Sequence, residues 1–254
     1  MKSRFQMSSM GELTFFLGLQ VKQNKGGIFI SQDKYVAEIL KKFDLVNVKA
    51  AITPMETKLP LTKDEDAFDV DVHLYRSMIG SLMYLTASRP DIMYVVCVCS
   101  RFQVTPKTSH LNAVKRIFKY LKGKPNFGLW YPRESPFDLE AFSDSDYGGS
   151  SLDRKSTTDG CQFLGQRLIS WQYFIEDCDE NEADSSAENT RQDLNVADLL
   201  TKPFDGPRYY LELERKCRLN LDMEKDMPAV TCSLDANWFA SFKSGGPLSH
   251  LILD

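Results

Sequence analysis

The chain has 254 residues, of which 43% are hydrophobic, and its formal net charge at pH 7 is −4. This length and composition suffice for one large folded domain or two small ones, and they exclude a wholly basic nucleic-acid-binding protein. No apolar stretch reaches the roughly 18 residues of a membrane span, and the amino-terminal residues lack the apolar segment of a signal peptide. We therefore expect an intracellular protein, cytoplasmic or nuclear, without a membrane partner.

The charges are distributed unevenly along the chain. No acidic residue occurs from Arg101 to Arg133, a segment with eight Lys and Arg residues, whereas residues 176–193 hold eight acidic residues and one arginine. Such a separation bears on binding partners rather than on the fold. The six cysteines show no CxxC spacing, so we expect reduced thiols rather than a zinc site or a disulfide framework.

The amino-terminal third predicts a hairpin and a helix. Residues 13–21 are a β-branched and aromatic run, and Gly26-Gly27 turns the chain into a second short strand at 28–30. Ser31 is expected to cap the helix that follows, whose apolar residues share one face. Residues 53–73, rich in prolines and acids, are expected to form an exposed linker.

Three further helices are predicted before the pattern changes. They are expected at residues 75–85, where Gly80 and Ser81 would allow close packing, at 92–102 after Pro90, and from Ser109 as cap to Gly123 as stop. In the last helix the predicted core stripe is Leu111, Val114, Phe118 and Leu121. Another face of that helix carries Lys115, Lys119 and Lys122.

Beyond Pro125 the period becomes that of strands. Residues 137–143, 160–164 and 167–171 predict a three-stranded antiparallel meander. Residues 173–193 are acidic and weakly apolar, and we expect them to be disordered. The tail at 208–254 shows only a possible helix near residue 210 and no other useful pattern.

Several strings resemble the Pol polyprotein of copia-type LTR retrotransposons, in the family's order. MGELTFFLGLQV at 10–21, YRSMIGSLMYLT at 75–86 and HLNAVKRIFKYLKG at 110–123 are similar to the primer-grip hairpin and the thumb and connection helices of its reverse transcriptase. AFSDSDYGG at 141–149, DRKSTT at 153–158 and NVADLLTK at 195–202 resemble its ribonuclease H. The resemblance covers about residues 4–172 and 193–207.

The resemblance implies a mixed α+β fold in three parts. Residues 1–135 would be the carboxy-terminal part of a reverse transcriptase, mostly helical. Residues 136–207 would be a truncated ribonuclease H-like sheet with an internal deletion near 173–193, and residues 208–254 a tail of unknown character. The family copies RNA into DNA and degrades the RNA strand of the hybrid. No Tyr-x-Asp-Asp motif occurs in this sequence, so we do not expect this chain to polymerise DNA.

The ribonuclease H of the family uses two Mg²⁺ ions held by about four carboxylates. The resemblance assigns catalytic roles to Asp144, Glu188 and Asp198, with Asp144 and Asp198 as metal ligands, but the strand for a further acid has no counterpart. Each assignment has a plain alternative. Asp144 and Asp146 can form a solvated turn, Glu188 can be one acid of a disordered run, and Asp198 can stabilise a helix N-terminus.

Two functions follow from these residues. The first is a catalytically inactive remnant that binds nucleic acid weakly, an RNA–DNA hybrid or a duplex, through Lys115, Lys119 and Lys122. A solvated helix face is the alternative interpretation of these three lysines. The second function is a working metal-dependent ribonuclease for RNA–DNA hybrids that uses Asp144, Glu188 and Asp198. Neither implies a small-molecule substrate.

Overall fold

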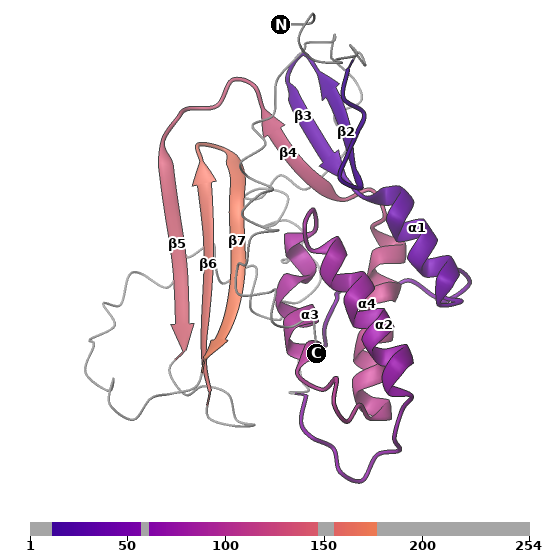
Figure 1. Cartoon of the computed structure of the whole chain (residues 1–254). Coiled ribbons are helices and arrows are strands. Elements are labelled where there is room, and N and C mark those ends of the chain that lie inside the picture. The colour runs from indigo at the N-terminus through magenta and orange to yellow at the C-terminus, as the bar shows by residue number, and fades with distance from the viewer. Residues whose placement is uncertain (1–11, 57–60, 147–154, 177–254) are drawn as a thin grey trace, which may run out of the picture.

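The computed structural model describes residues 12–56, 61–146 and 155–176, and these form the mixed α+β fold that the sequence predicts. The strands are β1 (Phe15–Phe16), β2 (Leu19–Asn24), β3 (Gly27–Ser31), β4 (Gly128–Pro132), β5 (Leu139–Asp146), β6 (Ser156–Leu164) and β7 (Arg167–Glu176). The helices are α1 (Asp33–Lys42), α2 (Val72–Leu85), the 3-10 helix η1 (Pro90–Ile92), α3 (Met93–Ser100) and α4 (Thr108–Gly123). Figure 1 shows the helices grouped on one side and β5, β6 and β7 on the other.

The predicted amino-terminal hairpin is present, but the run at 13–21 is two strands rather than one. Leu17 and Gly18 have φ angles of 48° and 81°, the left-handed geometry of a tight two-residue turn, so β1 folds back antiparallel on β2. A Cβ at Gly18 would collide with the Tyr84 hydroxyl, and the positive φ angle itself disfavours any side chain there. β2 and β3 then pair around the predicted glycine turn.

β4 completes the first sheet, and the sequence analysis did not predict it. It pairs antiparallel with β3, with Ile30 opposite Leu129, in the sheet order β1-β2-β3-β4. The helices of the described residues all lie between β3 and β4 in the chain. The pairing therefore brings the two ends of the helical region together.

The four predicted helices are confirmed, whereas two of their predicted caps are wrong. Ser31 is the last residue of β3, its hydroxyl donates to Asp33 Oδ1 at 3.0 Å, and Gln32 takes the cap position of α1. Ser109 lies inside α4, which Lys107 precedes as cap. Pairing with Gly128 of β4 holds Ser31 in the sheet, so tertiary structure overrides its local capping preference.

The helical core follows the predicted stripe. Val114, Phe118 and Leu121 of α4 are completely buried, and Leu111 packs half-buried at the margin. Burying each such side chain contributes roughly 1.5–3 kcal/mol. On α2, Ser81 is buried but Gly80 is exposed with open space above it, so the close packing predicted at Gly80 is wrong.

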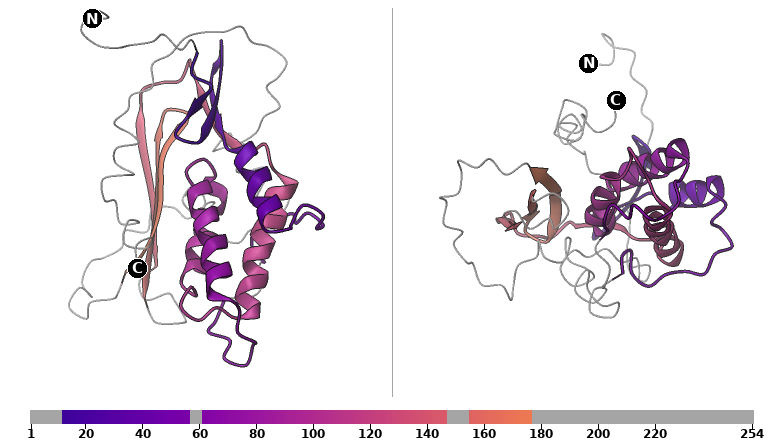
Figure 2. Two further views of the ribbon diagram at one scale, coloured as in Figure 1. Left: turned by 45° about the vertical axis from the view of Figure 1, so that its right-hand side comes forward. Right: turned by 90° about the horizontal axis from the view of Figure 1, so that it is seen from below.

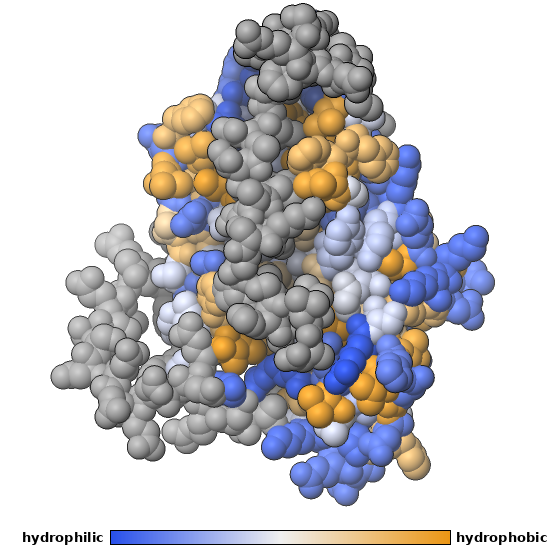
Figure 3. Space-filling view, in the orientation of Figure 1, coloured by the Kyte–Doolittle hydropathy of each residue, from blue (hydrophilic) through white to orange (hydrophobic). Residues whose placement is uncertain are grey.

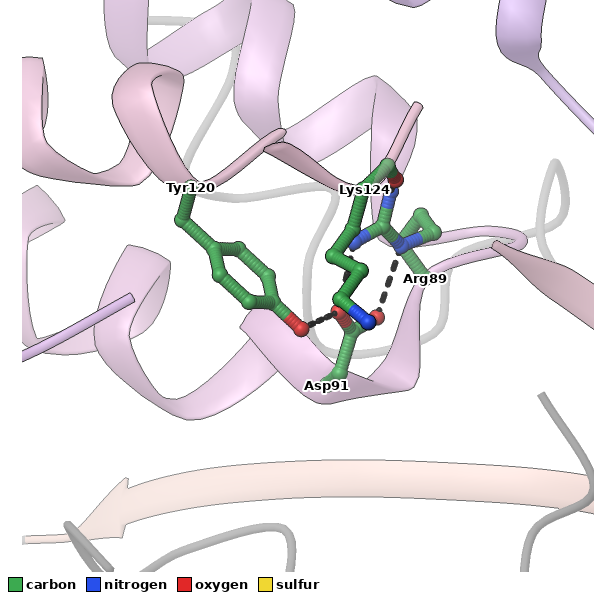
Figure 4. Close-up of polar contacts among 4 residues, drawn as sticks. All are labelled: Arg89, Asp91, Tyr120 and Lys124. Carbon is green, nitrogen blue, oxygen red and sulfur yellow. Dashed lines mark hydrogen bonds and ion pairs between the residues drawn. The ribbon is translucent and has the colours of Figure 1, made fainter. Parts of the chain in front are cut away.

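A buried ion pair fixes the start of α3 against the end of α4 (Figure 4). Arg89 Nη2 lies 2.7 Å from Asp91 Oδ2, and Arg89 Nε lies 2.9 Å from Asp91 Oδ1. The Tyr120 hydroxyl donates to the same Oδ2 at 2.7 Å, and Arg89 Nη1 donates to the Lys124 carbonyl oxygen at 3.0 Å. Burial disfavours the Arg89 cation, but the charge and hydrogen bonds of Asp91, together with Tyr120, outweigh this effect and raise the pKa of the guanidinium.

The predicted meander is confirmed, with longer strands than expected. β5, β6 and β7 form a second antiparallel sheet in chain order. No element was predicted past Gln172, but β7 continues to Glu176 and Tyr173 is only 8% exposed. The disorder predicted for 173–193 is therefore wrong for 173–176, and the rest of that segment lies outside the described residues, as does the tail at 208–254.

The second sheet packs on the helical part through β7 and α3, as both views in Figure 2 show. The Tyr94 ring of α3 meets the Tyr173 ring edge-on at 5.2 Å. Trp171 Nε1 donates to the Thr86 carbonyl oxygen at 3.0 Å, and the Tyr131 hydroxyl donates to the Leu168 carbonyl oxygen at 2.9 Å. In the part of the chain that the structure describes, no helix is long and apolar enough to cross a bilayer.

Candidate nucleic-acid interface and carboxylate pair

The three lysines predicted to contact phosphates lie off the core stripe of α4. Lys115, Lys119 and Lys122 are each half-buried, beside the completely buried core residues of the same helix. In Figure 3 hydrophilic side chains gather over the helical side of the molecule, toward the lower right of the view. The structure thus places these lysines on one helix, and their contact with phosphates stays a prediction.

A segment that runs along α4 contacts two of these lysines. The Ala51 amide donates to the Lys119 carbonyl oxygen at 3.1 Å. Lys122 Nζ donates to the Val48 carbonyl oxygen at 2.5 Å. We name residues 48–56 the α4 strap.

Part of the predicted linker at 53–73 is therefore docked rather than exposed. Pro54 of the α4 strap is buried, and the Val70 amide donates to the Pro106 carbonyl oxygen at 3.0 Å. Asp71 caps α2, where its side chain accepts from the His73 amide at 2.8 Å. The prediction of an exposed linker is confirmed for most residues at 62–69 and is wrong where Pro54 and Val70 contact the helical part.

Arg116 is a fourth cation on α4 that the sequence analysis did not assign to the site. Its Nη1 lies 2.7 Å from Glu56 Oε1, and its Nη2 donates to Thr53 Oγ1 at 3.0 Å. The side chains of this ion pair are 30% and 55% exposed. The lack of acids at 101–133 indicated that Arg116 belongs to a basic segment. Helical spacing within that segment could not predict its pairing with Glu56.

The candidate metal ligand Asp144 lies in β5, opposite an acid that the sequence analysis did not identify. Asp144 pairs in register with Asp159 of β6, and Asp159 pairs with Tyr173 of β7. Asp144 is half-buried and Asp159 is 6% exposed. Two carboxylates thus face each other across neighbouring strands, on the sheet face that contacts α3.

Burial and the charge of Asp159 raise the pKa of two neighbouring thiols and of one tyrosine hydroxyl. Burial first, and then the Asp159 charge, raises the pKa of the Cys97 thiol to about 12 and that of the Cys161 thiol to about 12. The same two causes, in the same order, raise the pKa of the Tyr94 hydroxyl. The thiols are therefore protonated near neutral pH, which does not favour metal binding.

A signal for Asp159 was present in the sequence. In β6 the buried residues alternate, because Cys161 and Phe163 share the parity of Asp159 and are buried with it. Period-two alternation places all three on one face. The β-strand prediction began only at residue 160, so the acid fell just outside it.

The described residues do not fit a pair of Mg²⁺ ions. Within residues 12–56, 61–146 and 155–176, no three His, Cys, Asp or Glu side chains come together so as to hold a metal ion. Glu188 and Asp198 lie outside the described residues, so their position relative to Asp144 stays a prediction. We assign no catalytic step to the carboxylate pair.

Comparison with known proteins gives two kinds of match. A family model described as reverse transcriptase (RNA-dependent DNA polymerase) matches residues 1–57. An uncharacterized mitochondrial protein of Arabidopsis thaliana is 38% identical over 172 residues, which cover 67% of this chain and 71% of that protein. No solved structure matches the chain significantly.

Two longer relatives are named as retrotransposon polyproteins. The retrovirus-related Pol polyprotein from transposon RE1 of Arabidopsis thaliana is 36% identical over 67% of this chain, but the match spans 12% of that protein. The retrovirus-related Pol polyprotein from transposon TNT 1-94 of Nicotiana tabacum is 32% identical over 68% of this chain and 14% of its own length. The chain thus spans a small part of these two polyproteins.

Proposed function

This chain belongs to the copia-type retrotransposon Pol polyprotein family, and from that membership we propose that it is a reverse transcriptase and ribonuclease H fragment that binds nucleic acid without catalysis. The ligand is an RNA–DNA hybrid or another duplex, bound weakly and without regard to sequence. Phosphates supply the binding energy, and α4 supplies the cations.

The observation that carries this proposal is the cation row on α4. Lys115, Lys119 and Lys122 lie along eight residues of helix, so the first and last are about 10 Å apart at about 1.5 Å per residue. A duplex offers about one phosphate charge per 1.7 Å of its axis, so the row can meet several phosphates at once. No acidic residue from 101 to 133 offsets these charges within the chain segment itself.

We propose the absence of catalysis from the number and placement of the carboxylates that could hold metal ions. Hydrolysis by two metal ions needs both ions held a few ångströms apart by a shared set of acids. In the described residues Asp144 has Asp159 as its facing acid, and Asp159 lies on the side of the sheet that α3 covers. The working ribonuclease would have to draw its remaining ligands from Glu188 and Asp198.

A salt titration tests the binding proposal. Affinity for a labelled RNA–DNA hybrid is measured from low to moderate salt for the wild type and for a Lys115→Ala, Lys119→Ala, Lys122→Ala variant. Each lost phosphate contact should flatten the slope of log affinity against log salt by about 0.9, so the triple variant should be flatter by about 2 to 3. Wild-type dissociation constants should be on the order of 10⁻⁴ to 10⁻⁶ M.

The matched control removes three exposed lysines elsewhere. Lys25, Lys41 and Lys63 are exposed and lie off α4, and their alanine variant changes the net charge by the same amount. It should keep a slope close to that of the wild type. Equal slopes for the wild type and the α4 variant would contradict the proposal and leave these lysines as an ordinary solvated face.

A further inference from the structure

The α4 strap, residues 48–56, is held along the cation row at its amino-terminal end. Val48 and Ala51 bond the side chain of Lys122 and the backbone of Lys119, respectively. A Cβ at Gly123 would lie 3.2 Å from the Ala50 Cβ, so the strap passes directly against the end of the helix. The contact therefore runs along the same helix as the proposed phosphate-binding cations.

The carboxy-terminal end of the strap holds the remaining cation. Glu56 pairs with Arg116, and Thr53 accepts a second hydrogen bond from the same guanidinium. The Thr53 hydroxyl in turn donates to the Met55 carbonyl oxygen at 2.8 Å, which orients it for Arg116. The strap thus engages two of the four cations on this part of α4, Arg116 and Lys122.

The Glu56 carboxylate occupies the position that a phosphate group would take. Arginine binds carboxylates and phosphates through the same fork of N–H groups. Because the ion pair is exposed to water, it contributes little to stability and a polyanion can replace it. The apolar contacts of the strap are modest, with Pro54 buried and Val48, Ala51 and Met55 packed half-buried against the core.

We propose that the α4 strap is an autoinhibitory contact, which masks Arg116 and Lys122 and is displaced when nucleic acid binds to α4. This inference rests on the proposed function. With the strap in place, Lys115 and Lys119 alone meet phosphates. With the strap displaced, all four cations do.

A reversible cross-link tests the strap directly. Ala50→Cys together with Gly123→Cys places two thiols where the Cβ atoms nearly meet, close to the separation that a disulfide requires. The oxidised form, with the strap locked, should bind a labelled hybrid with a salt slope of about −2. The reduced form should give a slope of about −3 to −4 and a correspondingly tighter binding at low salt. Wild type treated with the same oxidant and reductant controls for the native cysteines.

A second pair of variants needs no cross-link. Glu56→Gln removes the carboxylate that holds Arg116, while Glu65→Gln removes an exposed acid outside the strap at the same cost in net charge. Glu56→Gln should tighten hybrid binding several-fold relative to Glu65→Gln. It should also speed deuterium exchange of the Ala51 amide, which the strap bonds to α4.

The outcomes separate the strap from the proposed function. Equal binding by the oxidised and reduced cross-link variants, in a protein whose slope still depends on Lys115 and Lys119, overturns the strap alone. Equal binding by Glu56→Gln and Glu65→Gln also overturns the autoinhibitory role of the strap and leaves the proposed function in place. No salt-dependent binding by any form, the reduced variant included, overturns both the strap and the proposed function.

Discussion

Asp144 of β5 and Asp159 of β6 lie directly opposite each other, in a row that continues to Tyr173 of β7. Asp159 is buried toward α3, whereas Asp144, on the outer strand of the sheet, is half-buried. A cation that reached Asp144 would meet one further carboxylate among the described residues but no third ligand.

This pair leads to a prediction about hydrolysis. The purified chain with Mg²⁺ or Mn²⁺ should not cleave the RNA strand of an RNA–DNA hybrid above background, because the described residues hold too few acids near Asp144 to fix two metals. Gel separation of a labelled hybrid measures this, with Asp144→Asn alongside. Metal-dependent cleavage that Asp144→Asn abolishes would contradict the prediction and support the working ribonuclease.

Breaking the buried ion pair should strongly destabilise the helical part. Asp91→Ala leaves the Arg89 cation buried without its partner, so the free energy of unfolding should fall by about 3–5 kcal/mol in urea denaturation. Tyr120→Phe removes one hydrogen bond to the same carboxylate and should cost about 1–3 kcal/mol. Arg89→Met combined with Asp91→Leu should recover most of the loss. A cost for Asp91→Ala no larger than that of Tyr120→Phe would mean that the pair does not fix the helices.

Stability should fall at alkaline pH as the buried thiols ionise. Burial is the main reason why the pKa of the Cys97, Cys99 and Cys161 thiols rises from 9.0 to about 12 in the folded chain. Because the folded pKa exceeds the unfolded one, the contribution is complete below about pH 9 and is lost as the pH rises toward 12, by about 1.4 kcal/mol per pH unit for each thiol. Urea midpoints at successive pH values measure this fall. Cys97→Ser should make it shallower, and an unchanged slope in that variant would count against the assignment.

The sequence predicted the elements whose periodicity is strong and local. The stripe of Val114, Phe118 and Leu121 is visible in the sequence because side chains three and four apart share a helix face. β4 was missed because its five residues form a strand by pairing with β3, which lies about one hundred residues earlier in the chain. No local pattern encodes that pairing.

The sequence predicted which cations share a face of α4, but it did not predict which residues pack around them. The positions of Lys115, Lys119 and Lys122 follow from their spacing on α4. The contacts of the α4 strap with Lys119 and Lys122 use the Ala51 amide and the Val48 carbonyl oxygen, which no side-chain pattern indicates. Asp159 was missed for a different reason, since an acid is a poor marker of a buried strand position. β4, Asp159 and the α4 strap were missed where distant segments meet, whereas the turn at Leu17 and Gly18 and the cap of α4 were missed within local sequence.

The pairing of β3 with β4 has a consequence for synthesis on the ribosome. Gly27–Ser31 emerges from the ribosome long before its partner Gly128–Pro132, so one edge of β3 has no neighbouring strand while the helices form. An open strand edge is a template for pairing with other chains. A nascent chain that stops short of residue 128 therefore lacks the strand that covers this edge of β3.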